Sequence, residues 1–111
     1  MKKNKISKNW INKQRRDIYV RRSKIEGYRS RAIYKLKEID EKFKILKQSR
    51  SVVDLGAAPG SWSQYLAKNI KNGKILSIDL LQFEPIKNTH QIVGDFTDGK
   101  YKAQIKNYFN G

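Results

Sequence analysis

The chain has 111 residues and is strongly basic, with 25 Lys and Arg against 10 Asp and Glu and a formal net charge of +15 at pH 7. That length allows one small domain, or the front half of a larger α/β domain. The sequence has no cysteine, a single histidine (His90), a charged N-terminus and no apolar run of bilayer length. We therefore expect a cytoplasmic protein without disulfides, metal sites, a signal peptide or a membrane segment.

The basic residues are concentrated in the first part of the chain. Residues 1–50 hold 18 of the 25 Lys and Arg but only 5 of the 10 Asp and Glu, an excess of +13. Such asymmetry favours a polyanionic partner bound through its phosphates, with RNA preferred over an anionic membrane surface because a clean amphipathic face is lacking. A biased composition with ordinary solvated faces is the alternative. Residues 1–8 are predicted to be a basic flexible tail.

Residues 9–26 favour a helix that ends at Gly27, a typical C-terminal cap. Basic side chains cover much of its surface, which suits a helix lying against RNA, although an ordinary solvated helix has the same composition. A few apolar and aromatic side chains are candidate buried anchors: Trp10, Ile11, Ile18, Tyr19 and Ile25.

A second helix is predicted after Gly27, with Ser30 as its N-cap and its end before Gln48. Its apolar stripe at helical spacing consists of Ala32, Leu36, Ile39 and Phe43. Lys35 falls at the boundary of that stripe, so its ammonium either overlooks a cleft or simply reaches solvent over a buried stem. Spacing alone favours the second interpretation. We treat residues 9–50 as one basic helical region for RNA binding and substrate positioning.

The stretch SVVDLGAAPGSW, residues 51–62, combines a short apolar strand with a loop of small residues. We expect the strand to be buried on both faces and the loop between Gly56 and Gly60 to let backbone approach a ligand. From Ser61 the pattern becomes helical, with a stripe of Trp62, Tyr65, Leu66 and Ile70. In a parallel sheet, such a strand, loop and helix bind an adenosine-type ligand at the carboxyl ends of the strands.

Two further strands are predicted, each ending in a carboxylate. KILSID, residues 74–79, ends at Asp79, 25 residues after Asp54, which is close to the usual place of an acid that accepts hydrogen bonds from ribose hydroxyls. Residues 91–93 end in Gly94-Asp95-Phe96, where Asp95 is a candidate acceptor for the adenine amine. The alternatives are a solvent-exposed strand end for Asp79 and plain turn formation for Asp95.

The last predicted element is a helix over residues 100–109, which Asn110-Gly111 would close. One face carries its apolar residues, Tyr101, Ile105, Tyr108 and Phe109. The predicted fold class is therefore α/β, with about three parallel strands in residues 51–111 preceded by basic N-terminal helices.

Four motifs in fixed order resemble the FtsJ family of ribosomal RNA 2′-O-methyltransferases: GYRSRAIYKL, VVDLGAAPGSWSQYL, SIDLL and GDF. The resemblance runs from about Trp10 to Phe96. It implies a Rossmann-like fold that uses S-adenosyl-L-methionine to methylate a uridine ribose 2′-hydroxyl in large-subunit (23S) ribosomal RNA. A nicotinamide-dependent enzyme is a lesser alternative, because the loop lacks the GxGxxG pattern.

The resemblance implies roles for individual residues. Cofactor contacts are expected at Gly60 and Trp62, at Asp79 for the ribose and at Asp95 for the adenine, while Gly56 shapes the turn. Ser61 stands where such loops commonly have glycine.

For the substrate side, the resemblance matches Lys35 to the first residue of the family's Lys-Asp-Lys-Glu catalytic set, overturning the interpretation that spacing favours. The basic region adds three candidate ligands of RNA phosphates, Lys24, Arg29 and Arg31, with Tyr28 or Trp10 as candidate stacking partners for a base.

The other three members of the catalytic set have no counterpart in these 111 residues. We therefore expect an N-terminal portion of the enzyme, residues 51–111 being the first half of the cofactor-binding domain, and a monomer in the intact protein. The alternative is a catalytically incomplete product that only binds RNA or cofactor.

Overall fold

The computed structural model describes residues 2–48 and 50–110, with side chains from Ser7 onward. Its elements, in chain order, are α1 (Lys2–Glu26), α2 (Ile33–Phe43), the 3-10 turn η1 (Leu46–Gln48), β1 (Ser51–Leu55), α3 (Ser61–Asn69), β2 (Lys74–Asp79), β3 (His90–Val93) and α4 (Gly99–Asn110).

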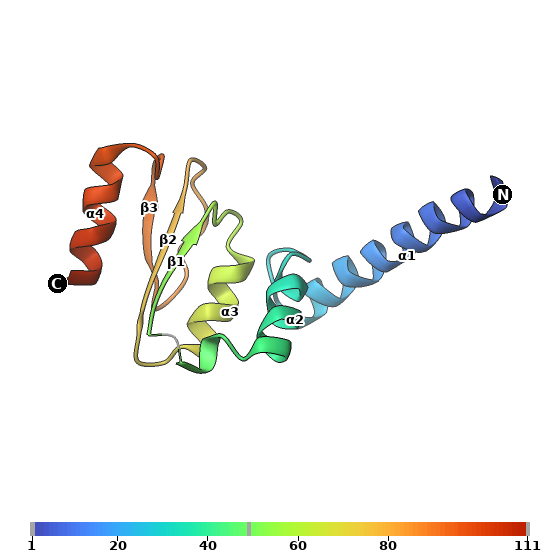
Figure 1. Cartoon of the computed structure of the whole chain (residues 1–111), viewed down its shortest axis with the longest axis horizontal. Coiled ribbons are helices and arrows are strands. Elements are labelled where there is room, and N and C mark those ends of the chain that lie inside the picture. Colours follow the sequence, from blue (N-terminus) through green and yellow to red (C-terminus); the bar gives the residue numbers. More distant parts are fainter. Residues whose placement is uncertain (1, 49, 111) are drawn as a thin grey trace.

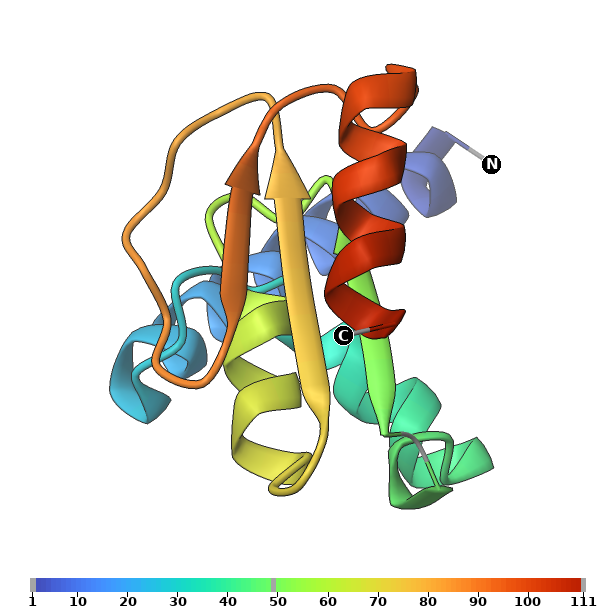
Figure 2. The same cartoon turned by 90° about the vertical axis from the view of Figure 1, so that its left-hand side faces the viewer.

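The three strands form one parallel sheet in the order β1-β2-β3, as predicted. Helix α3 covers one face and α4 the other (Figures 1 and 2). Alternate residues of β2 face the two layers, because successive strand side chains point to opposite faces. Ile75 packs in the cluster with α2 and α3, whereas Leu76 and Ile78 pack beneath α4. The central strand is therefore the core of the fold.

Strand β1 is less buried than the sequence predicted. Val52 and Val53 are half-buried, and Leu55 is 51% exposed. Within the described residues β1 pairs only with β2, so it forms an edge of the sheet. A strand at the edge of a sheet has a paired strand on one side only, so its side chains are less covered than those of the central strand β2.

Helix α1 extends away from the body of the molecule (Figure 1). It begins at Lys2, so residues 2–8 of the predicted flexible tail (1–8) are helical, and Met1 lies outside the described residues; no glycine or proline interrupts the sequence before Gly27. Gly27 has φ +82° directly after the helix, as expected for a cap. The predicted buried anchors are wrong, since all five are 41–85% exposed: Trp10, Ile11, Ile18, Tyr19 and Ile25.

The C-terminal part of α1 contacts the body of the molecule. The Tyr19 ring stacks on the Tyr34 ring of α2 at 5.2 Å between centroids, and the Arg22 guanidinium lies 4.8 Å from the Tyr34 ring centre. Ser23 is buried there. Elsewhere, over the side chains that the structure describes, the helix has no core to pack against, which explains why the five predicted anchors stay exposed.

Helix α2 differs from its predicted stripe and cap. Leu36 is buried as predicted, but Ile33 and Tyr34 are the other buried residues, and Phe43 is 64% exposed. The N-cap is Ala32, without a side-chain capping bond. Ser30, the predicted cap, instead forms a 2.8 Å hydrogen bond with Ser61. The hydroxyl of Ser30 therefore bonds to Ser61, 31 residues away in the sequence, in place of a backbone N–H of α2. None of the described helices has the length and apolar content needed to cross a membrane.

In α4, all four predicted apolar residues pack on the second core cluster: Tyr101, Ile105, Tyr108 and Phe109. Its predicted closing residue Gly111 lies outside the described residues.

Candidate functional site

The loop between β1 and α3, residues 56–60, is called the glycine loop here, and it crosses the carboxyl end of β2. The backbone N–H groups of Gly56 and Ala57 both donate to the carbonyl of Ile78, at 2.8 and 3.1 Å. Gly56 has φ +70°, a conformation that side chains other than glycine rarely adopt, and an added Cβ would meet no atom within 4 Å. The turn thus needs glycine for its backbone angle and leaves open space beside it.

Asp79, predicted to bind a ribose, lies at the end of β2 and braces this loop. One carboxylate oxygen accepts from the N–H of Ala58 at 2.9 Å and the other from the N–H of Leu81 at 2.8 Å. A carboxylate has about four lone-pair positions, so two such bonds leave acceptor capacity for a ligand.

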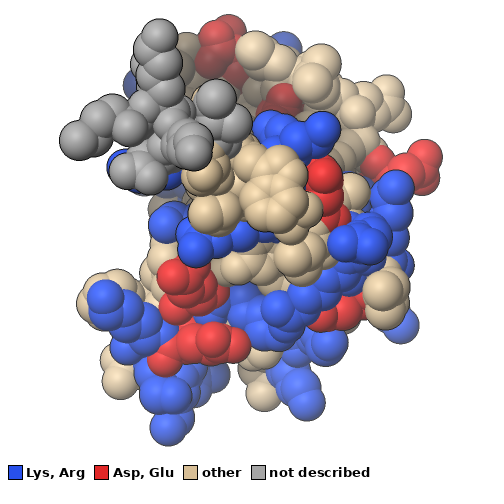
Figure 3. Space-filling view, turned by 90° about the vertical axis from the view of Figure 1, so that its right-hand side faces the viewer, with Lys and Arg blue, Asp and Glu red and all other residues tan. Residues whose placement is uncertain are grey.

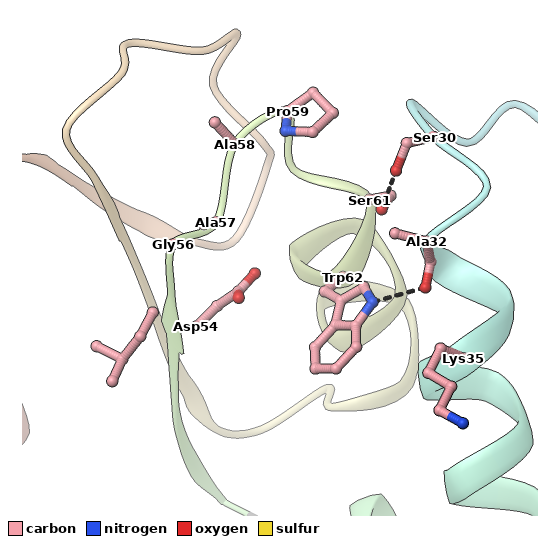
Figure 4. Close-up of a pocket in the computed structure, with 11 residues that line it drawn as sticks. Ser30, Ala32, Lys35, Asp54, Gly56, Ala57, Ala58, Pro59, Ser61 and Trp62 are labelled. Carbon is pink, nitrogen blue, oxygen red and sulfur yellow. Dashed lines mark hydrogen bonds between the residues drawn. The ribbon is translucent and has the colours of Figure 1, made fainter.

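A pocket of about 390 Å³ opens between this loop and the start of α2 (Figure 4). The volume is within the range of small-molecule sites, about 300–1,000 Å³. Its lining comes from two stretches of the chain, residues 30–35 and 54–62: Ser30, Ala32, Lys35, Asp54, Leu55, Gly56, Ala57, Ala58, Pro59, Ser61 and Trp62. Three of the predicted site residues therefore share one pocket, namely Lys35, Gly56 and Trp62. Gly60, Asp79 and Asp95 lie outside its lining.

Trp62 connects the two sides of the pocket. Its indole N–H donates to the carbonyl of Ala32 at 2.7 Å, and the same carbonyl accepts from the backbone N–H of Lys35 at 3.3 Å. Lys35 is exposed on the first turn of α2, and in the view of Figure 4 the Trp62 ring stands between it and Asp54. The indole thereby fixes the helix turn that carries Lys35.

Gly60 allows other side chains to pack closely against the glycine loop. Its φ is +110°, and an added Cβ would lie 2.8 Å from Cδ1 of Ile86, 3.0 Å from Nη1 of Arg29 and 3.2 Å from Cδ2 of Phe83. The segment after β2 therefore rests directly on Gly60.

Asp54 is a site residue that sequence reasoning missed. It is 7% exposed, lines the pocket, and accepts a 2.6 Å hydrogen bond from the Ser63 hydroxyl. Burial raises the pKa of Asp54; the Ser63 hydrogen bond opposes that rise, and the charge of Asp79 adds to it. Its position in the sequence could have indicated this role, because Asp54 is a carboxylate near the end of a predicted strand and shortly before the glycine loop.

Asp95 follows β3 and is exposed. One of its carboxylate oxygens accepts from the hydroxyl of Thr97 at 2.6 Å and from the N–H of Thr97 at 2.9 Å, and these bonds lower the pKa of Asp95. Phe96 beside it is 40% exposed. Because parallel strands end at the same edge of a sheet, Asp79 and Asp95 lie on the side where the glycine loop begins.

The basic region presents many cations to solvent. Figure 3, a view toward α1, shows Lys and Arg side chains over much of the face, with fewer acidic groups between them. Lys24 and Arg31 are exposed, whereas the Arg29 guanidinium donates to backbone carbonyls of two loops. Of the candidate stacking residues, Trp10 is 60% exposed, but Tyr28 is half-buried against the core.

Comparison with known proteins gives a consistent result. The sequence profile of the FtsJ-like methyltransferase family matches residues 28–111. The ribosomal RNA large subunit methyltransferase E of Pelagibacter ubique (strain HTCC1062) is 63% identical over 109 residues, covering 98% of this chain and 54% of that protein. The protein of the same name from Janthinobacterium sp. (strain Marseille) is 45% identical over 118 residues, covering 100% and 55%.

A crystal structure of a ribosomal RNA methyltransferase from Plasmodium falciparum is also similar, with a TM-score of 0.58 and 37% identity over 69% of this chain and 48% of that one. The chain spans about half the length of the relatives it matches. The family profile matches most of the chain, including the glycine loop and the segment that carries Lys35, and the resemblance inferred from the motifs is confirmed. The chain belongs to the FtsJ-like methyltransferase family.

Proposed function

We propose that this chain is the cofactor-binding and substrate-positioning part of an S-adenosylmethionine-dependent enzyme that methylates a ribose 2′-hydroxyl of large-subunit ribosomal RNA. The observation that carries the proposal is the pocket of about 390 Å³ in which the loop backbone at Gly56, the Trp62 indole and Lys35 come together. Family membership favours methyl transfer over the nicotinamide-dependent alternative. Ribosomal RNA as substrate implies a cytoplasmic location in a bacterium.

The residues fit the cofactor. The loop has methyl-sized side chains at Ala57 and Ala58 and open space beside Gly56, which suits close approach of a ligand to backbone. Asp79 supplies acceptors for ribose hydroxyls and Asp95 an acceptor for the adenine amine. When bound, S-adenosylmethionine supplies an activated methyl group on a sulfonium.

On the substrate side, Lys35 orients the 2′-hydroxyl by donating hydrogen bonds from its ammonium. Aligning the reacting groups is the main contribution expected from the protein in such a displacement. Lys24 and Arg31 are exposed and hold backbone phosphates, while the exposed Trp10 ring offers a stacking surface for a base.

Calorimetric titration of S-adenosylmethionine tests the cofactor assignment. We expect saturable binding to the chain, at least about tenfold weaker binding to Asp79→Asn, and unchanged binding to Asp17→Asn, a matched control on the exposed surface of α1. Asp79→Asn keeps the shape of the side chain, and circular dichroism verifies its fold. A folded chain that takes up no cofactor contradicts the assignment.

The salt dependence of RNA binding tests the phosphate contacts. Lys24→Gln and Arg31→Gln should each weaken binding and reduce the slope of log K against log salt by about 1. Lys106→Gln on α4, at the opposite end of the molecule from α1, is the matched control (Figure 1). Equal slopes for all four proteins contradict the assignment.

The chain as a product that only binds RNA is the competing hypothesis, motivated by Lys35 being the one matched member of the family's catalytic set. A methyl-transfer assay on large-subunit RNA separates the two. Incorporation by this chain clearly above that of Lys35→Ala contradicts the binding-only hypothesis, and equal incorporation supports it.

A further inference from the structure

Arg29 joins two loops that flank the ends of β1 and β2. Its Nη1 donates to the carbonyl of Pro59 at 3.0 Å and also to the carbonyl of Glu84, and its Nη2 donates to the carbonyl of Pro85 at 3.2 Å. Pro59 belongs to the glycine loop, whereas Glu84 and Pro85 belong to the segment between β2 and β3. One guanidinium therefore serves three backbone acceptors in two separate loops.

The backbone on which Arg29 sits is itself held in place. The N–H of Arg29 donates to Oε1 of Gln64 at 2.8 Å, and Nε2 of Gln64 donates to the carbonyl of Gly27 at 3.1 Å. Because Gln64 lies in the first turns of α3, the helix that follows the glycine loop sets the position from which the guanidinium reaches out.

Beneath the guanidinium the two loops are in direct contact. The position of a Cβ on Gly60 is 3.0 Å from Nη1 of Arg29 and 2.8 and 3.2 Å from Ile86 and Phe83. The segment after β2 is otherwise without helix or strand structure between Leu80 and Thr89. Two of its carbonyl groups, those of Glu84 and Pro85, accept from Arg29. The carbonyls of Phe83 and Ile86 accept from Gln91 and Thr89, which lie further along the chain and do not connect the segment to the glycine loop.

We propose that Arg29 is a positioning residue that holds the segment of residues 82–86 against the glycine loop and so keeps in place the loop backbone that lines the pocket. The inference rests on the proposed function for the identity of the cofactor. In this proposal the guanidinium holds two loops together, whereas the sequence-based prediction was that Arg29 binds an RNA phosphate. Arginine suits this role because its planar fork presents five N–H donors at fixed angles, whereas lysine presents a flexible point charge.

The test compares Arg29→Lys and Arg29→Gln with the parent chain. Arg50→Gln is the matched control, since Arg50 is exposed directly before β1, at the end of the strand remote from the glycine loop. Two quantities are measured: backbone ¹⁵N order parameters of residues 81–88, and the affinity for S-adenosylmethionine by calorimetry. The order parameters of β2 amides verify that each variant is folded.

We expect both Arg29 variants to lower the order parameters of the segment from about 0.85 to below about 0.6, and both to bind the cofactor about tenfold more weakly. Arg50→Gln should change neither. An Arg29→Lys variant that keeps a rigid segment and full cofactor affinity overturns the proposal, because the positive charge alone is then sufficient. So does weakened RNA binding with an unchanged segment. A parent chain that binds no cofactor refutes the proposed function, while the order parameters still decide the role of Arg29.

Discussion

Replacing Gly60 by alanine isolates the contact between the glycine loop and the segment after β2. The new Cβ would be strained by φ +110° and would meet Ile86, Arg29 and Phe83 at 2.8, 3.0 and 3.2 Å. Left-handed backbone costs about 1–2 kcal/mol for a residue with a Cβ. Overpacking a filled site adds about 1–3 kcal/mol. We expect Gly60→Ala to lower the free energy of unfolding by about 2–5 kcal/mol.

Two other glycines separate the backbone term from the packing term. Gly27 also has positive φ, +82°, but an added Cβ would meet nothing within 4 Å, so Gly27→Ala should cost only about 1–2 kcal/mol. Gly99, the first residue of α4, has neither a positive φ nor a close neighbour, and Gly99→Ala should be neutral or stabilising by up to about 1 kcal/mol.

Urea unfolding followed by circular dichroism measures all three variants, with the cofactor absent. If Gly60→Ala is no more destabilising than Gly27→Ala, the segment of residues 82–86 does not rest on the glycine loop as described. The bracing role of Arg29 would then lose its structural basis as well.

Two further substitutions test hydrogen bonds that side chains of α3 donate to carboxylates. The Tyr65 hydroxyl donates to Asp40 at 3.0 Å, and burial, followed by this bond, raises the pKa of Tyr65 to about 12. A raised folded pKa means that this stabilisation is complete below pH 10 and is lost between pH 10 and about 12. In urea titrations, the stability difference between the parent and Tyr65→Phe should therefore shrink over that window, and a constant difference would refute this. Ser63→Ala removes the donor to Asp54 and should destabilise the chain by about 1–3 kcal/mol. The control Ser51→Ala, at the exposed start of β1, should change the free energy of unfolding by no more than about 0.5 kcal/mol. Equal effects of the two substitutions in chemical denaturation would contradict the buried bond.

The local sequence determined the elements whose pattern depends on neighbouring residues. The apolar run before Gly56 and the apolar stripe after Ser61 predicted strand, loop and helix. Backbone preferences and side-chain periodicity act within a few residues, so they can be read along the chain. The same reasoning placed the cap at Gly27, which takes positive φ.

Tertiary structure alone decided which side chains are buried and which groups they meet. Ile11, Ile18 and Ile25 of α1 recur every seven residues, yet the helix leaves the body (Figure 1) and they stay exposed. Ser30 bonds to Ser61 across 31 residues, and Arg29 reaches carbonyls 30, 55 and 56 residues away. A hydrogen-bond partner at that separation depends on how the elements pack in three dimensions, and no local pattern of residues encodes it. The roles of Arg29 and Gly60 in joining two loops therefore emerged only from the folded chain.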